Sequence, residues 1–188
     1  MGNNFSALDR EQWMNLQLEV NKTKAAYMHA FKSAVERQQR TLNTENLLGG
    51  LWIMESRFGG MGGKYDPVLW WRLNTAGRDS LRIQFEVGDG LKLKKGHLTL
   101  ARLGAWIPQI KELFTAEAGW YISHDAVMRN NSVFGIPQDG GFKGAAREIW
   151  LLGKEPERYA GMLCEFIRPY LTDQKVIRLF KEIDAMEI

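Results

Sequence analysis

The chain of 188 residues is 45% hydrophobic, carries a formal net charge of +3 and has one cysteine. This length suits a single domain with a sizeable core, and no apolar run approaches the roughly 20 residues that span a bilayer. A single cysteine excludes an internal disulfide and a multi-cysteine zinc site. Together with an N-terminus that lacks the pattern of a secretory signal, it indicates a cytoplasmic protein.

Residues 6–42 are predicted to form one long helix. The stretch Ser6-Ala7-Leu8-Asp9 fits an acidic variant of a capping box, and neither Pro nor Gly interrupts the residues that follow. A narrow apolar stripe recurs at steps of about three and four residues, and it consists of Trp13, Leu16, Val20, Tyr27, Phe31, Ala34 and Leu42. Such a stripe packs along one edge only. Part of the helix is therefore expected to project and to dock to a partner or to a second copy, and the alternative is a helix that lies across a sheet with a frayed end.

Residues 47–125 are predicted to form a sheet, because short apolar runs alternate with Gly-rich breaks. The run 80–87 alternates apolar and polar residues, which is typical of a half-buried antiparallel strand. The Gly-Asp-Gly turn after it predicts a hairpin with Leu91–Lys95. An amphipathic helix is predicted to be inserted at 106–118. The other predicted strands are 49–58, 68–73, 97–103 and 119–125.

The C-terminal part, 148–188, is predicted to be helical after a polar, loop-like stretch at 126–144. Pro156 opens one helix, Pro169 disturbs its end, and Thr172 caps the next. The whole chain, 1–188, is therefore predicted to be one α+β domain with a mostly antiparallel sheet, a long N-terminal helix, one inserted helix and C-terminal helices.

The stretch from Gly96 to Gly104, GHLTLARLG, contains the run His97-Leu98-Thr99-Leu100. In a strand, His97 and Thr99 would point to the same side, where an imidazole can move a proton and a hydroxyl can hold a phosphate oxygen. This run resembles the His-apolar-Thr-apolar signature of the two-histidine phosphoesterases, which implies cleavage of RNA or cyclic-nucleotide phosphodiesters. That family uses two such motifs. Here His124 would have to supply the second, and no Thr or Ser stands two residues after it.

Two further features indicate binding. The Gly-rich stretch 58–67 could present backbone N–H groups to a phosphate, although its spacing does not fit a nucleotide-binding P-loop. Aromatic residues stand beside basic ones at 68–73, and the densest basic run is 92–95, as suits an acidic partner. The candidate binding residues are Gly60, Gly62, Gly63, Lys64, Trp70, Trp71, Arg72, Lys92, Lys94 and Lys95.

No set of motifs assembles a complete catalytic site, a metal site or a cofactor site. We therefore interpret the sequence as a non-enzymatic binding or regulatory protein. Its expected partner is acidic, either nucleic acid or a protein that handles nucleic acid, and a homo-oligomer through the N-terminal helix is a further expectation. The alternative is a metal-independent phosphodiesterase built on His97, Thr99 and His124. Gly2 and Ser6 formally match a myristoylation pattern.

Overall fold

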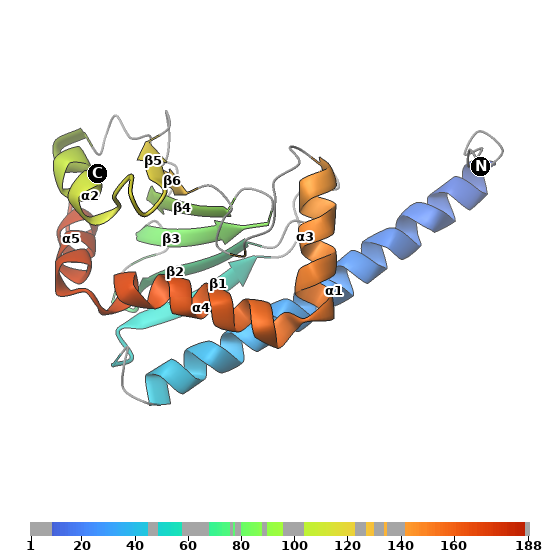
Figure 1. Cartoon of the computed structure of the whole chain (residues 1–188), viewed down its shortest axis with the longest axis horizontal. Coiled ribbons are helices and arrows are strands. Elements are labelled where there is room, and N and C mark those ends of the chain that lie inside the picture. Colours follow the sequence, from blue (N-terminus) through green and yellow to red (C-terminus); the bar gives the residue numbers. More distant parts are fainter. Residues whose placement is uncertain are drawn as a thin grey trace.

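The computed structural model of the chain describes residues 9–44, 49–57, 68–75, 77, 80–87, 90–95, 104–122, 127–129, 134 and 142–186. Figure 1 shows its elements, which in chain order are α1 (Arg10–Thr44), β1 (Trp52–Arg57), β2 (Val68–Leu73), β3 (Leu81–Glu86), β4 (Gly90–Lys95), α2 (Ile107–Leu113), β5 (Trp120–Ile122), β6 (Val127–Arg129), α3 (Phe142–Lys154), α4 (Pro156–Thr172) and α5 (Gln174–Asp184).

The described strands form one sheet with the order β1-β2-β3-β4-β6-β5, and every neighbouring pair is antiparallel. The first four strands follow one another as a meander, and the predicted hairpin between 80–87 and 91–95 is the β3–β4 pair. The predicted α+β class, with a long N-terminal helix, an inserted helix and C-terminal helices, is confirmed. The predicted strand at 97–103 lies outside the described residues.

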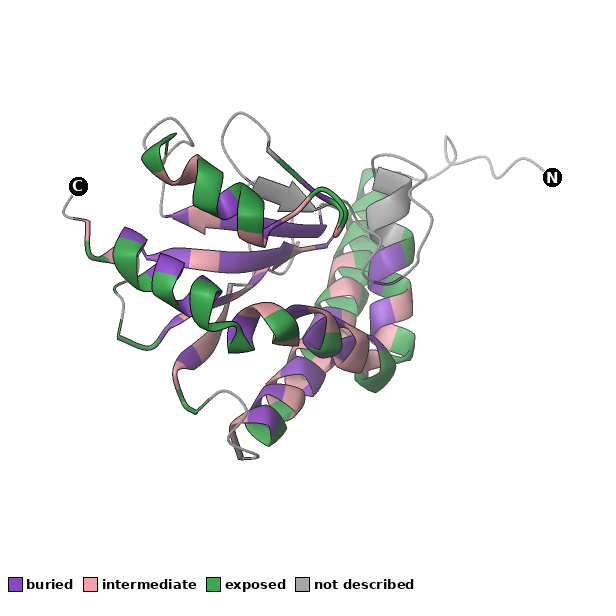
Figure 2. Cartoon of the chain, turned by 60° about the vertical axis from the view of Figure 1, so that its left-hand side comes forward, coloured by how far each residue is buried: buried purple, intermediate pink, exposed green. Residues whose placement is uncertain are grey.

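The helices contact one face of the sheet, which we call the inner face. Alternation along β2 and β3 places Leu69, Trp71, Ile83 and Phe85 on this face, where each is at most 1% exposed. Figure 2 shows buried residues gathered where helices and strands face each other. The ring contacts between the two layers are Phe31–Phe85 at 6.0 Å, Trp52–Phe180 at 5.0 Å, Phe114–Trp120 at 4.9 Å and Trp120–Tyr170 at 5.7 Å.

Helix α1 packs on the body only along its C-terminal half. From Met28 onward its apolar stripe is buried, whereas residues 11–20 are all exposed. In Figure 1 this N-terminal part extends away from the other elements, so the predicted projection is confirmed. The predicted cap at Ser6 lies outside the described residues. The structure forms a capping box one turn later, where Asp9 Oδ1 accepts from the Gln12 N–H and Gln12 Oε1 accepts from the Asp9 N–H.

Helices α1 and α3 cross closely at Gly153. A Cβ at this position would lie 2.5 Å from Cδ2 of Tyr27 and closer still to Tyr27 Cβ and Cγ. Only glycine allows the two helices to approach this far. This crossing lies at the point on α1 where the projecting part meets the body.

The C-terminal helices differ in detail from the prediction. Helix α3 begins at Phe142, within the stretch predicted as a loop. Helix α4 continues through Pro169 to Thr172, whose hydroxyl donates to the Arg168 carbonyl at 2.9 Å and is not used as a cap. Asp173 caps α5 instead, because its Oδ1 accepts from the Lys175 N–H at 2.7 Å. No helix in the described part of the chain has the length and apolarity required to cross a membrane.

Candidate binding surface

The side of the sheet opposite the helices carries the polar and aromatic residues that the sequence places between the core positions. We call it the outer face. Because cross-strand partners point to the same side of a sheet, the register of the strands assigns side chains to this face directly. The polar and aromatic residues of the outer face are Glu55, Trp70, Arg72, Arg82, Gln84, Glu86, Lys92, Lys94 and Tyr121, and the apolar Ile53 and Val68 share this face.

One row of cross-strand partners runs across all six strands of this face. Starting from β1, each residue pairs with the next, and the row is Glu55, Trp70, Gln84, Lys92, Met128 and Tyr121. It carries a tryptophan near one edge and, at the other edge, a tyrosine that is 42% exposed. Beside this row, Arg72, Arg82 and Lys94 stand on β2, β3 and β4, where Arg82 and Lys94 are direct partners. The row and these three basic residues give the face aromatic and cationic groups side by side.

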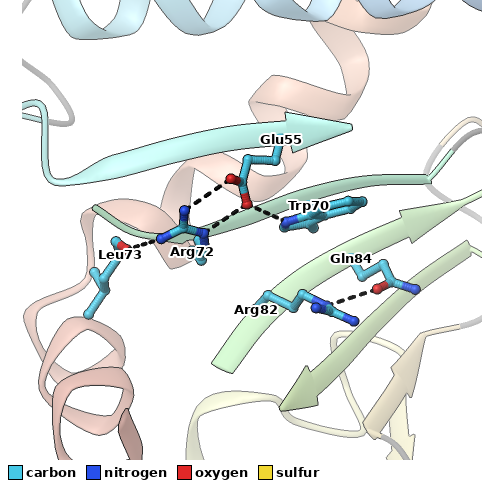
Figure 3. A network of polar contacts seen from close by, with 6 residues as sticks. All are labelled: Glu55, Trp70, Arg72, Leu73, Arg82 and Gln84. Carbon is cyan, nitrogen blue, oxygen red and sulfur yellow. Dashed lines mark hydrogen bonds and ion pairs between the residues drawn. The ribbon is translucent and has the colours of Figure 1, made fainter. Parts of the chain in front are cut away.

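Glu55 organises the β1–β2 end of the outer face (Figure 3). Its Oε2 accepts from Trp70 Nε1 at 2.8 Å and from Arg72 Nε at 2.8 Å, and its Oε1 accepts from a second Arg72 nitrogen at 3.0 Å. Arg72 also donates to the Leu73 carbonyl at 3.4 Å. The hydrogen bonds that Arg72 donates to the Glu55 carboxylate raise the pKa of Arg72 above its ordinary value and hold the guanidinium in place.

A second chain of contacts lies on β3 and β4. Arg82 Nε donates to Gln84 Oε1 at 3.0 Å, the Gln84 amide donates to Glu86, and Lys92 Nζ donates to Glu86 Oε2 at 2.6 Å. The Arg82 guanidinium also lies over the Trp70 ring, 5.5 Å from its centroid. Arg82 therefore connects the two networks, because it contacts both Gln84 and the Trp70 ring.

The outer face has a surplus of positive charge. Four cations, Arg72, Arg82, Lys92 and Lys94, stand against two carboxylates, Glu55 and Glu86, which leaves +2 among the described residues of this face. The carboxylates pair with Arg72 and Lys92, whose side chains are only 12% and 10% exposed. No hydrogen bond or ion pair joins Lys94 to the described part of the chain. Lys94 therefore carries part of the surplus charge, next to its cross-strand partner Arg82.

The structure separates the predicted binding residues. Trp70, Arg72, Lys92 and Lys94 come together on the outer face, while Trp71 is fully buried on the inner face. Trp71 Nε1 donates there to Gln39 Oε1 at 3.1 Å.

Lys95 also points inward. It is 6% exposed, and its ammonium contacts the Ile183 carbonyl and lies 3.7 Å from Asp184 Oδ1. Trp71 and Lys95 therefore belong to the core, and we leave them out of the surface.

The other predicted residues lie outside the described part of the chain. These are Gly60, Gly62, Gly63 and Lys64 of the Gly-rich stretch, and His97, Thr99 and His124 of the phosphoesterase-like pattern.

Four residues of the outer face were not among the predicted binding residues, and these are Glu55, Arg82, Gln84 and Glu86. Alternation in the run 80–87 indicated that the last three share one side. No sequence signal gave the strand register that brings Glu55 to Trp70.

A pocket of about 240 Å³ lies elsewhere, between α2 and α5. Its charged residues balance, with two cations and two carboxylates, and it is smaller than typical small-molecule sites. It is lined by Gln109, Glu112, Leu113, Lys175, Arg178, Leu179 and Glu182. Among the residues that the structure describes, no three His, Cys, Asp or Glu side chains come together as a metal site would require.

Comparison with known proteins adds no relative. The chain matches no protein-family model, no curated protein and no solved structure.

Proposed function

We propose that the protein is a non-enzymatic binding protein whose outer face engages an acidic partner, and that single-stranded nucleic acid is the partner class this face suits best. The observation that carries the proposal is the placement of Trp70 and Arg82 in contact, with Arg72 and Lys94 beside them. Aromatic rings and guanidinium planes on a sheet are groups on which unpaired bases stack, and cations beside them bind the phosphates.

The arrangement of charge supports this proposal. Arg72 and Lys92 are paired with carboxylates of the outer face, so they contribute mainly to its structure. Lys94 makes no hydrogen bond or ion pair with the described part of the chain, so a phosphate can approach it without displacing an internal contact. Arg82 is its cross-strand partner and adds a second positive charge beside the Trp70 ring. Two such cations give a modest electrostatic contribution, so we expect weak, salt-dependent binding.

The test measures anisotropy of a labelled single-stranded oligonucleotide as protein and salt are varied. We expect the double variant Arg82→Gln, Lys94→Gln to weaken binding about tenfold and to lower the salt slope by roughly 2, because two phosphate contacts are lost. The matched control is Arg178→Gln, Lys181→Gln, which removes the same charge from exposed positions of α5 in the helical layer.

Equal weakening in the two double variants would show that net charge matters and the outer face does not. If the wild type binds no oligonucleotide at low salt, nucleic acid is not the partner. Binding of an acidic polypeptide that depends on Arg82 and Lys94 would then assign the surface to a nucleic-acid-handling protein, and its absence would reject the proposal.

The phosphodiesterase is the second candidate, and one observation favours it. Strands β4 and β5 lie on either side of β6 and both run antiparallel to it, so they are parallel to each other. The two strands are about 10 Å apart, and their C-terminal ends point in the same direction. His97 and His124 each follow the end of one of these strands by two residues in the sequence. The assay incubates the protein with linear and cyclic oligonucleotides without metal. Cleavage that is lost in His97→Ala and kept in His29→Ala, which changes a histidine of α1, would support this candidate, and no cleavage by the wild type would reject it.

A further inference from the structure

The projecting part of α1 exposes an unusual amount of apolar surface. Seven large hydrophobic residues are exposed in the described part of the chain, and five of them lie between positions 13 and 20 of this helix. Their exposed fractions are 48% for Trp13, 59% for Met14, 39% for Leu16, 52% for Leu18 and 40% for Val20. Clustered apolar exposure of this kind marks an interaction site more often than isolated exposed residues do.

Three of these residues continue the side of α1 that faces the core. Trp13 precedes the buried Phe31 by 18 residues, which is five full turns of an α-helix, and Leu16 precedes the buried Ala34 by the same interval. Val20 lies one turn after Leu16, on the same side of the helix. We call Trp13, Leu16 and Val20 the free stripe. The side that contacts the body in one half of the helix is therefore left without a contact to the described residues in the other half.

Met14 and Leu18 do not belong to the free stripe. At about 100° per residue, each lies more than roughly 100° around the helix from the middle of the stripe. They are as exposed as the stripe residues and stand on the same segment. This makes them matched controls.

We propose that the free stripe is the contact through which two copies of this chain pair, with the two α1 helices antiparallel. A two-fold axis midway between positions 16 and 17 would place Trp13 of one copy against Val20 of the other, because these positions are equally far from the axis. The same axis would place Asp9 of one copy against Lys24 of the other.

Charge favours a second copy over other occupants. Asp9 lies one turn before Trp13 and Lys24 one turn after Val20, so the stripe has a carboxylate at one end and an ammonium at the other. Antiparallel pairing brings opposite charges together at both ends, whereas parallel pairing brings like charges together. Residues 9–26 carry three acidic and three basic side chains, a net charge of zero, which gives no attraction to anionic membranes or nucleic acid.

The contact starts from a helix that is already formed. The C-terminal half of α1 is held in the body, and the box of Asp9 and Gln12 caps the free end, so association does not have to order the segment. The apolar area on three side chains is small beside a standard interface. We therefore expect a dimer with a dissociation constant on the order of 10 µM.

The first experiment measures molar mass by sedimentation equilibrium of the full chain from about 1 to 200 µM, a range that brackets this constant. The wild type should change from monomer to dimer, Leu16→Glu should stay monomeric, and Leu18→Glu should dimerise like the wild type. Far-UV circular dichroism and thermal melting should be unchanged in both variants, because neither residue contacts the core. A monomeric wild type, or equal loss of dimer in both variants, would overturn the proposal.

The second experiment tests the orientation by cross-linking introduced cysteines. Cys164 is buried, and burial raises its thiol pKa to about 12, so it does not compete for the reagent. A short bismaleimide should join Asp9→Cys chains to Lys24→Cys chains in a mixture and should join neither variant to itself. Cross-linking of either variant alone would show parallel pairing, and absence of the mixed product would reject the proposed register.

Discussion

Replacing Gly153 by alanine should destabilise the protein, although the same change in an open helix stabilises it. Alanine in a helix interior is favoured over glycine by about 1 kcal/mol. At Gly153 the new methyl group would overlap Cβ, Cγ and Cδ2 of Tyr27, and Cβ is attached to the backbone of α1 and cannot rotate away. Helix α1 must then move away from α3, and overpacking of this kind costs about 1–3 kcal/mol. The propensity gain offsets part of this cost, so we expect Gly153→Ala to lower the free energy of unfolding by up to about 2 kcal/mol.

Gly161 of α4 provides the matched control, because a Cβ at that position meets nothing within 4 Å. Gly161→Ala should raise the free energy of unfolding by about 1 kcal/mol, so the two variants should differ by the overpacking cost of about 1–3 kcal/mol. Urea denaturation followed by circular dichroism measures both values. A Gly153→Ala protein as stable as Gly161→Ala would refute the close crossing of α1 and α3.

Two further predictions concern buried ionisable groups. Burial raises the pKa of the Cys164 thiol to about 12, so a thiol reagent at pH 8 should label the native protein at the rate of unfolding and the denatured protein at once. Burial also raises the pKa of Asp184, although the Leu81 N–H and Lys95 oppose the shift. A raised carboxyl pKa adds stability that is fully present below the ordinary value and is lost as the pH rises through the folded-state value. The stability of the wild type relative to Asp184→Asn, measured by urea denaturation, should therefore increase as the pH falls from 7 toward 4, and a constant difference would contradict the shift.

Local patterns in the sequence predicted most of the elements because each depends on nearby residues, but β6 lies within 126–144, which was predicted as a loop. The run 68–73 is β2 as predicted, and the alternation in 80–87 assigned its apolar residues to the core. Local patterns do not show which residues far apart in the sequence contact each other. The burial of Trp71 and the outward position of Trp70 follow from which side the helices cover, and the inward position of Lys95 depends on a contact with α5. The same holds for Glu55, whose three hydrogen bonds require the β1–β2 register.

The sequence pattern of α1 likewise did not show which part of the helix would pack against the body. The stripe lapses at Thr23 and again at Gln38, and neither lapse showed which part of the helix would belong to the core. The difference arises because the crossing with α3 lies at Tyr27, and the sheet and α4 contact the helix after that point. Which part of an amphipathic helix is core and which part is surface is decided by the length of the body it packs against.

The projecting half of α1 also governs how the molecule moves through solvent. A compact domain of 188 residues has a radius of gyration of about 16 Å, whereas the 35-residue helix alone is about 52 Å long, and residues 10–26 account for about 26 Å of it. Frictional drag depends on the longest dimension, so a single chain should diffuse and elute as a larger particle than its mass of 21.6 kDa implies. A size estimate from elution volume alone would then give a monomer the appearance of a dimer.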